Sequence, residues 1–369
     1  MSVGDLSSKK FKFFSFLSMV LLVYVHGYNL QNSYLQPFST VHEPLTVTTF
    51  TEYFLANGLF RFRIPMLFII SGFLFTLGDD QPHGTRISKR ARTLLLPYII
   101  WGGVAILITF LLQQNSFTAA IVQKASIDQF GNNRPYAAQP IGLMIRRWIF
   151  APPSFQLWFI RCLFFYNLLY PLMLRACTKY PWVWFSVVGF LWFTTSGFYF
   201  VEGEGLMFFS LGIFIAKKGF DIEQPLNKKL WWTACIAFIG SALAKTIVAF
   251  YVKDNIPNGI LLSVLHKTTE FAGLVTMWYG IDSLIKYLMH RQWFVWISGF
   301  AFIIYAMHVP LVNYLTTYLN SALNYLPLHR ITVFIAAPTI IIICCIAFGA
   351  LFRKLLPKVY SVCTGGRGM

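Results

Sequence analysis

The chain has 369 residues, of which 57% are hydrophobic and 12% charged, and its mean hydropathy is +0.60. This composition excludes a soluble globular domain and a disordered chain, because both expose far more polar surface. The net charge of +17 does not indicate a nucleic-acid partner, since the basic residues are dispersed between apolar runs rather than clustered. We therefore expect a polytopic membrane protein in contact with the lipid bilayer.

Apolar runs long enough to cross a membrane recur along the whole chain. A helix needs about 20 residues to span a hydrocarbon core of roughly 30 Å. We therefore predict an all-α fold: one membrane-embedded domain over residues 1–369, built as a transmembrane bundle of about ten helices. The predicted spans are 11–29, 58–77, 93–113, 154–174, 181–200, 204–218, 229–251, 260–285, 294–315 and 332–352.

The first span follows Lys9, Lys10 and Lys12 and has the outline of a signal peptide, but no small-x-small cleavage site follows it. We expect it to be retained. Most lysines and arginines fall on one side of the predicted membrane, so the positive-inside rule puts both termini in the cytoplasm. The expected location is the inner, cytoplasmic membrane. The basic residues on the opposite side are Lys124, Arg134, Arg146, Arg147, Lys253 and Arg330.

The longest predicted outer loop spans residues 114–153, and we expect it to form a partly structured cap. Its Tyr136 and Trp148, with Phe155 just beyond, could stack on sugar rings or anchor the chain at the membrane interface. No cysteine lies in an outer loop and no metal-ligand spacing occurs, so we expect neither a disulfide framework nor a metal site. Nothing in the sequence predicts an oligomeric state.

Several ionisable residues fall inside the predicted spans, where Arg, Lys or Asp costs roughly 2.5–3.5 kcal/mol at mid-bilayer. At about 1.5 Å per residue, His26 and His308 both lie roughly 21–23 Å from the inner edge. Arg161, His266 and Glu270 lie about 9–15 Å below the outer edge. We therefore expect one polar layer in the outer half of the bundle, as a buried reaction or binding site requires.

Structural roles are the alternative for each of these residues, including both histidines. Arg61 and Lys245 could extend to the membrane interface, with only their stems in the apolar layer. His266 and Glu270 are four residues apart on a predicted helix and could pair only with each other. Ser71 and Gly72 favour close helix packing rather than nucleophilic catalysis. Pro65, Pro97, Pro171 and Pro310 are expected to kink their helices.

A basic run, Arg86, Lys89, Arg90 and Arg92, leads into the third span. On a helix it would form a basic face suited to phosphate groups, although an ordinary positive-inside anchor is the alternative. Lys12 shares a helical stripe with His26, about 21 Å away. This spacing suggests a donor with a polyanionic head and a thin arm, such as a coenzyme A thioester. Neutral His26 could then take the proton of an acceptor hydroxyl.

In this order, the motifs resemble the acyltransferase-3 family of integral membrane acyltransferases. The resemblance covers nearly the whole chain. It rests on His26, the segment 63–75, the basic run into Pro97 and Tyr98, the segment 157–161 and the segment 304–310. It implies a ten-helix enzyme that moves acetyl or another acyl group from cytoplasmic acyl-CoA to glycan hydroxyls in bacterial envelopes.

The resemblance also implies roles for particular residues. His26 matches the family's catalytic histidine, Arg63 its arginine before the Pro and Ser-Gly element, and Arg86 to Arg92 its arginine motif near the donor. One branch of the family has an arginine eleven residues before the histidine, where this chain has Ser15. We expect Lys12 to replace that arginine.

We therefore predict an O-acyltransferase that uses acyl-CoA, in the simplest case acetyl-CoA, as donor substrate and has no permanently bound cofactor. The acceptor would be a hydroxyl of an envelope or secreted glycan, or of its lipid-linked precursor. A transporter or flippase with a buried polar path is the alternative, and a non-catalytic membrane partner of a glycan-assembly complex is another. The predicted catalytic residues are His26, Arg63, Arg161 and His308; the donor residues Lys12, Arg86, Lys89, Arg90 and Arg92; the acceptor residues His266 and Glu270.

Overall fold

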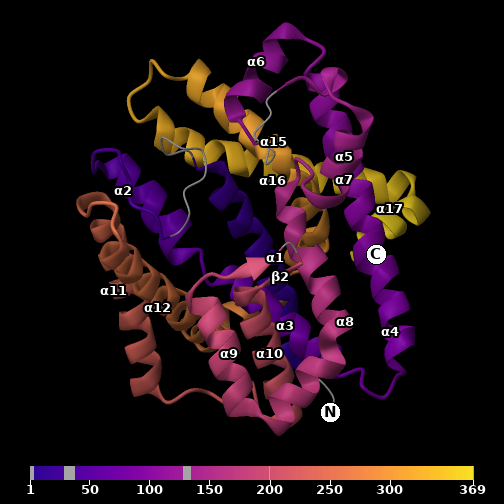
Figure 1. Ribbon diagram of the computed structural model, residues 1–369, viewed down its shortest axis with the longest axis vertical. Coiled ribbons are helices and arrows are strands. Elements are labelled where there is room, and N and C mark those ends of the chain that lie inside the picture. The colour runs from indigo at the N-terminus through magenta and orange to yellow at the C-terminus, as the bar shows by residue number, and fades with distance from the viewer. Residues whose placement is uncertain (1–3, 29–37, 128–133, 199, 369) are drawn as a thin grey trace. The chain divides into compact units, whose positions relative to one another are not determined.

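The structure is a computed structural model that describes residues 4–28, 38–127, 134–198 and 200–368. Within these residues the fold is helical, apart from strands β1 (Gly197–Phe198) and β2 (Val201–Glu202), which pair antiparallel (Figure 1). The predicted all-α fold class is therefore confirmed.

Seven helical segments of the described residues are long and apolar enough to cross a membrane, which confirms a multi-pass membrane protein. They are Asp5–Gly27, Val47–Thr76, His83–Leu112, Phe155–Lys179, Lys228–Tyr251, Ala301–Ala322 and His329–Leu355. Of the other predicted spans, 181–200 and 204–218 correspond to the short helices α9 (Pro181–Phe193) and α10 (Gly203–Lys218). The span 260–285 overlaps α12 (Ile256–Gly280), which is long enough but more polar.

The second predicted span begins earlier than its apolar run. The helical segment starts at Val47 rather than at residue 58, because Thr46 and Thr49 form a capping box at its N-terminus. It continues through α2 (Val47–Tyr53) and a π-helical turn, η1 (Phe54–Leu59), before α3 (Arg63–Thr76). The threonines and Glu52 of α2 lower the hydropathy of the helix start, so the apolar run alone places the beginning of this span too late.

The chain divides into two compact units that interleave in sequence. The first comprises Met1–Leu21, Gln36–Arg90 and Cys162–Ser298. The second comprises Leu22–Leu35, Ala91–Arg161 and Gly299–Met369. Helix α1 (Asp5–Gly27) therefore belongs to the first unit up to Leu21 and to the second from Leu22.

The first unit is built around close contact between α3 and α10. A Cβ on Gly72 would lie 2.2 Å from the carbonyl oxygen of Phe209, and one on Gly212 would lie 2.2 Å from that of Ile69. Because glycine has no Cβ, the backbones of α3 and α10 can come into direct contact at both positions. The packing role expected for Gly72 is therefore confirmed. The other helices of this unit are α4 (His83–Arg90), α8 (Trp158–Lys179), α9, α11 (Lys228–Tyr251), α12, α13 (Asp282–Met289) and α14 (Gln292–Ser298).

The second unit packs α15 (Ala301–Ala322) against α16 (His329–Leu355) and places shorter helices of the predicted cap on α5 and α15. Residues 128–133 of the cap lie outside the described residues, but its flanks are helical, as a partly structured loop predicts. The remaining elements are η2 (Ala91–Leu95), α5 (Leu96–Leu112), α6 (Ser116–Ala125), η3 (Tyr136–Ala138), α7 (Ile141–Phe150), η4 (Phe155–Leu157) and α17 (Pro357–Thr364).

The prolines differ in their effects. Pro310 interrupts α15, because Val309 before it has extended backbone angles (φ −102°, ψ 132°). Pro65 and Pro97 lie near the starts of α3 and α5, in helical segments that contain the π-helical turns η1 and η2 just before them, and the kinks expected there stay a prediction. Pro171 lies inside α8, which continues on both sides of it.

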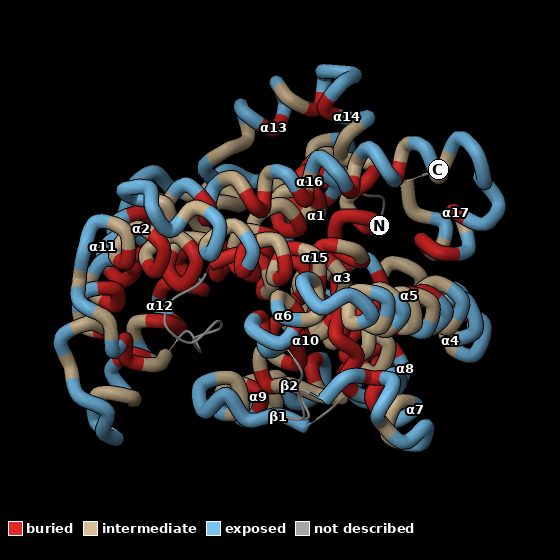
Figure 2. The backbone as a smooth tube through the Cα atoms, turned by 90° about the horizontal axis from the view of Figure 1, so that it is seen from above, coloured by how far each residue is buried: buried red, intermediate tan, exposed pale blue. Residues whose placement is uncertain are grey.

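Large apolar side chains are exposed on the outer helices, including Trp182, Phe190, Ile236 and Ile343. Figure 2 shows the contrast between α11, with many exposed turns, and α15, which is mostly buried. In water such surfaces would aggregate, whereas a bilayer solvates them.

We predict that Gly72→Ala destabilises the protein by about 1–3 kcal/mol, because the added methyl group overpacks the contact between α3 and α10. The matched control is Gly240→Ala on α11, where an added Cβ meets nothing within 4 Å. That change should be neutral or stabilise by up to about 1 kcal/mol. Thermal unfolding in detergent measures both, and equal midpoints for the two variants would contradict the packing role.

Candidate functional site

The second unit brings His26 and His308 together in a buried pair. His26 lies at the last turn of α1, His308 lies on α15 just before its break, and their side chains are nearly inaccessible. The distance between His26 Nδ1 and His308 Nε2 is 3.0 Å. The sequence placed these residues at one depth, and the structure places them in contact.

The hydrogen bonds of the pair determine which nitrogen carries each proton. His308 Nδ1 lies 2.8 Å from the carbonyl oxygen of Ile304, which can only accept, so Nδ1 is the protonated nitrogen. In the neutral ring Nε2 then accepts, and His26 Nδ1–H donates to it. The proton-accepting nitrogen of neutral His26 is therefore Nε2, the tautomer that a general base facing away from His308 requires.

The break in α15 is held by Gln156, a residue that sequence reasoning missed. Pro310 has no N–H for the carbonyl of Ala306, and the Gln156 side-chain amide donates to that oxygen at 3.3 Å. The same amide donates to the carbonyls of Tyr305 and Val309, and the Tyr305 hydroxyl donates to the Gln156 carbonyl at 2.8 Å. A polar residue directly before the 157–161 motif was the signal available in the sequence.

The end of α1 is tied to α15 in the same way. The last carbonyls of a helix have no partner within it. Here Asn313 Nδ2 donates to the His26 carbonyl at 3.1 Å, and Thr316 Oγ1 donates to that of Gly27 at 3.3 Å. The ring of Phe155 lies 4.8 Å from the His26 ring, centroid to centroid. The backbone and ring of His26 are therefore both held in place.

Arg161 lies in the same unit at the start of α8. Its guanidinium donates to the carbonyl of Phe150 and, at 3.5 Å, to the hydroxyl of Tyr98, which itself donates to the carbonyl of Ile149 at 2.7 Å. These contacts tie the C-terminal end of α7 to α5 and α8. Its predicted catalytic role stays a prediction.

The first unit holds a second buried polar cluster, on α11, α12 and η1. Lys245 Nζ donates to the Asn57 carbonyl and lies 3.2 Å from His266 Nδ1. His266 Nε2 lies 3.0 Å from Glu270 Oε1, which confirms the pairing expected from their spacing. Lys267 Nζ lies 3.3 Å from Glu270 Oε2. Lysine only donates and carboxylate only accepts, so His266 is the neutral link between the two.

Arg61 and Arg63 are also buried in the first unit. Arg61 donates to the Asn57 side chain, and Arg63 Nη1 donates to the Phe60 carbonyl at 2.7 Å. Arg61 and Lys245 therefore do not extend to the protein surface, and that alternative is wrong for both. Arg63 lies in the first unit and His26 in the second, so its action on the acceptor stays a prediction.

The basic run is divided between buried and exposed side chains. Arg86 is buried, its guanidinium lies 3.8 Å from the Phe75 ring centroid, and its Nη1 lies 2.8 Å from Asp79 Oδ1. Asp79 also accepts hydrogen bonds from Lys217 at 2.5 Å and Tyr170 at 2.7 Å. Burial raises the pKa of Asp79, but these hydrogen bonds outweigh it, so its pKa is below the ordinary value. Arg86 thus has a structural role of its own.

The other predicted donor residues are more accessible. Lys89 and Arg92 are exposed, and Arg90 is half-buried with its guanidinium 5.4 Å from the Phe75 ring centroid. Lys12 is exposed on α1. Two residues before it, Lys10 is fully buried and forms an ion pair of 2.7 Å with Asp282.

Comparison with known proteins identifies the family of this chain. The family model described as an acyltransferase domain, Acyl_transf_3, matches residues 12–350. The succinoglycan biosynthesis protein ExoH of Rhizobium meliloti (strain 1021) is 28% identical over 327 residues, which cover 85% of this chain and 81% of the relative. No solved structure gives a significant match. Because the family match spans most of the sequence, the chain belongs to the acyltransferase-3 family and is a membrane-embedded O-acyltransferase.

Proposed function

We propose that this protein transfers an acyl group, in the simplest case acetyl, from cytoplasmic acyl-CoA to a hydroxyl of an envelope or secreted glycan. Family membership makes it an enzyme rather than a transporter, and the similarity to a succinoglycan biosynthesis protein supports a polysaccharide acceptor. The observation that carries the proposal is the buried His26–His308 pair, whose hydrogen bonds give His26 the tautomer of a base. The proposed location is the cytoplasmic membrane.

In the proposed reaction, His26 Nε2 takes the proton of the acceptor hydroxyl as its oxygen attacks the thioester carbonyl. The C–O bond forms, the C–S bond breaks, and the departing thiolate of coenzyme A takes up the proton from the His26 imidazolium. His308 positions the base: it accepts from Nδ1–H throughout and stabilises the imidazolium, as the buried third member of a catalytic triad does.

The remaining roles are proposals that rest on sequence and burial. Lys89 and Arg92, exposed in the basic run, and Lys12 are suited to the phosphates of the donor. Arg63 and Arg161 would orient the acceptor or stabilise the oxyanion, with His266 and Glu270 contributing to acceptor binding.

We predict that His26→Ala lowers acyl transfer by about 10²–10⁴-fold, the contribution of a positioned general base. The assay incubates membranes with radiolabelled acetyl-CoA and extracted glycan and measures label in the glycan. His290→Ala, at an exposed histidine of the same chain, is the control and should retain activity. Undiminished turnover of His26→Ala with normal thermal unfolding would disprove the assignment of the base.

We predict that His308→Phe lowers kcat by at least about tenfold, up to the ~10⁴-fold seen when a triad histidine is held in the wrong tautomer. KM for the donor should stay unchanged, and the pH profile of kcat should shift. His308→Gln, whose amide oxygen can still accept from His26 Nδ1–H, should restore part of the rate. Identical rates for the Phe and Gln variants would show that His308 only fills space.

We predict that Glu270→Gln destabilises the protein by about 3–5 kcal/mol, because it leaves Lys267 and Lys245 in the buried cluster without their carboxylate. The control is Asp5→Asn, which removes an exposed pair with Lys9 and should cost about 0–1 kcal/mol. Thermal unfolding in detergent measures both. Full stability with a raised KM for the acceptor would instead make Glu270 a substrate ligand only.

A further inference from the structure

The basic run is divided between two helical elements that have different supports. Arg86 and Arg90 lie on α4, whereas Arg92 lies in η2, the π-helical turn that leads into α5. Arg86 is paired with Asp79, while Arg92 is exposed and accessible to a ligand. Turns of this kind are rare and frequently lie at functional sites. The position in which Arg92 is presented therefore depends on what holds η2.

Residues 357–368, which we call the C-terminal clasp, pack against η2 and α5 within the second unit. The clasp consists of α17 and the four residues 365–368 that follow it. Figure 1 shows α17, in yellow, beside α5, and the contacts of α17 extend to η2. The family model matches residues 12–350, so the clasp lies beyond the matched region.

Two side-chain hydrogen bonds join the clasp to the start of α5. Pro97 has no N–H for the carbonyl of Thr93, four residues earlier, and Arg367 Nη1 donates to that carbonyl at 2.8 Å. Further along α5, Trp101 Nε1 donates to the Cys363 carbonyl at 2.9 Å. Because Thr93 directly follows Arg92, the first of these bonds holds the backbone of η2 next to the exposed arginine.

Gly365 brings the backbone of the clasp against η2. A Cβ on Gly365 would lie 2.5 Å from the carbonyl oxygen of Thr93 and 2.8 Å from its Cα, which is too close for any side chain. Its φ of +61° also lies in the left-handed region that favours glycine. Gly366 has a φ of +78°, but a Cβ there would meet nothing within 4 Å. The two glycines share the backbone requirement, and of the two only Gly365 contacts η2.

The clasp is also attached to the helices that follow the histidine pair and carry His308. Arg353 Nη1, on α16, donates to the Gly368 carbonyl at 2.9 Å, and its guanidinium lies 4.5 Å from the Phe300 ring centroid at the start of α15. The Arg367 guanidinium lies 4.9 Å from the ring centroid of Phe302 on α15. The clasp therefore connects η2 to the helix on which His308 lies.

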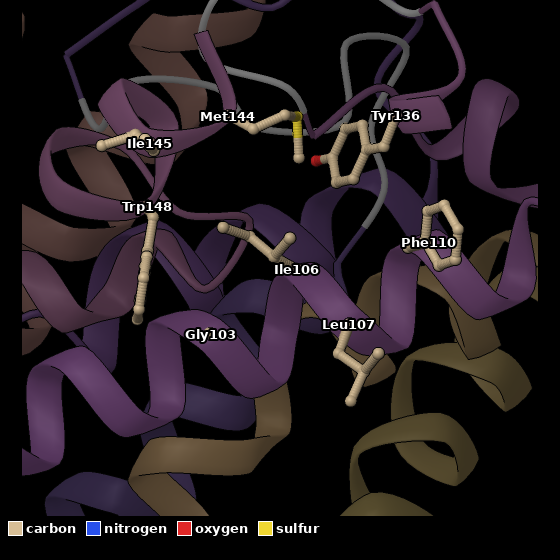
Figure 3. A pocket seen from close by; sticks show the side chains of 8 residues that line it. All are labelled: Gly103, Ile106, Leu107, Phe110, Tyr136, Met144, Ile145 and Trp148. Atoms are coloured by element: carbon tan, nitrogen blue, oxygen red, sulfur yellow. The ribbon is translucent and has the colours of Figure 1, made fainter. Parts of the chain in front are cut away.

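Helix α5 is held independently by α7 beyond its first turn. Trp148 Nε1 donates to the Ile99 carbonyl at 2.8 Å, and a Cβ on Gly103 would lie 3.4 Å from the same nitrogen. Figure 3 shows the Trp148 side chain of α7 pointing toward α5 near Gly103. Because this contact lies beyond η2, it does not act on Arg92 directly. Variants of Trp148 and of the clasp can therefore separate a general loosening of α5 from a change at η2.

We propose that the C-terminal clasp positions the donor site: it holds η2 so that the Arg92 guanidinium meets the phosphates of the acyl donor. The inference rests on the proposed use of acyl-CoA and adds a role for a segment outside the matched family region. Arg92 would touch the donor, whereas Gly365 and Arg367 act through the backbone of η2. A guanidinium that is held in place binds phosphate with a smaller loss of conformational freedom.

The test measures the binding of coenzyme A to the purified full-length protein by calorimetry, with kcat and the KM for acetyl-CoA measured in parallel. Gly365→Ala should weaken binding and raise KM about tenfold, as expected for one lost charge-assisted hydrogen bond, and leave kcat unchanged. Gly366→Ala is the matched control, because it carries the same φ strain without contact with Thr93. It should bind coenzyme A as the unaltered protein does, and so should Trp148→Phe.

Two further variants test the route through which the clasp acts. Arg92→Ala should weaken binding about tenfold, and adding Gly365→Ala to it should have no further effect, because both changes remove the same contact. Arg367→Ala should resemble Gly365→Ala without introducing a backbone clash, which keeps the test valid if Gly365→Ala does not fold. Arg367→Lys should restore part of the affinity, since its ammonium group can still donate to the Thr93 carbonyl.

Equal coenzyme A affinities for Gly365→Ala and Gly366→Ala, or additive effects of Gly365→Ala and Arg92→Ala, would overturn the inference. Weakened binding by Trp148→Phe would overturn it as well, because a general loosening of α5 would then be the cause. Normal binding by Arg92→Ala would contradict both the donor assignment and the clasp. His26→Ala separates the inference from the proposed base, since that variant should lose acyl transfer and still bind coenzyme A.

Discussion

The hydrogen bond between His26 and His308 is the interaction on which the second unit and its proposed chemistry depend. It joins the last turn of α1 to α15 at the point where α15 is broken by Pro310. The break leaves the Ala306 carbonyl without a backbone donor, and the Gln156 side-chain amide donates to it. In the unbroken turn before the break, the Ile304 carbonyl accepts from His308 Nδ1, which places the proton on that nitrogen. Helix geometry, tautomer and the direction of the proposed proton transfer thus follow from one local arrangement.

Hydrogen bonding inside the apolar layer shapes other parts of the fold as well, because a buried polar group that water cannot reach needs a partner from the protein. Pro97 leaves the carbonyl of Thr93, four residues earlier, without a helical donor, and Arg367 donates to it at 2.8 Å. In the first unit, Lys245 donates to His266 Nδ1, and His266 Nε2 in turn donates to the Glu270 carboxylate. These clusters are therefore structural even where they also serve a substrate, and loss of one member exposes the charge of another.

The proposed acyl-CoA donor places its own requirement on the protein. A CoA thioester is a polyanion and needs exposed cations at one face, which Lys89 and Arg92 offer while Arg86 is bound to Asp79. The donor would then be held by parts remote from its reacting thioester, and binding energy from such parts is what positions a reacting group.

What the sequence determined by itself was position along each helix. Hydropathy identified a multi-pass helical protein, the rise per residue put His26 and His308 at one depth, and four-residue spacing paired His266 with Glu270. Only the tertiary structure decided which faces meet. It assigned Gln156 to the break in α15 and Arg86 to Asp79. Axial position follows from a fixed local geometry, whereas the partner of a side chain depends on segments distant in sequence, whose packing no local period encodes.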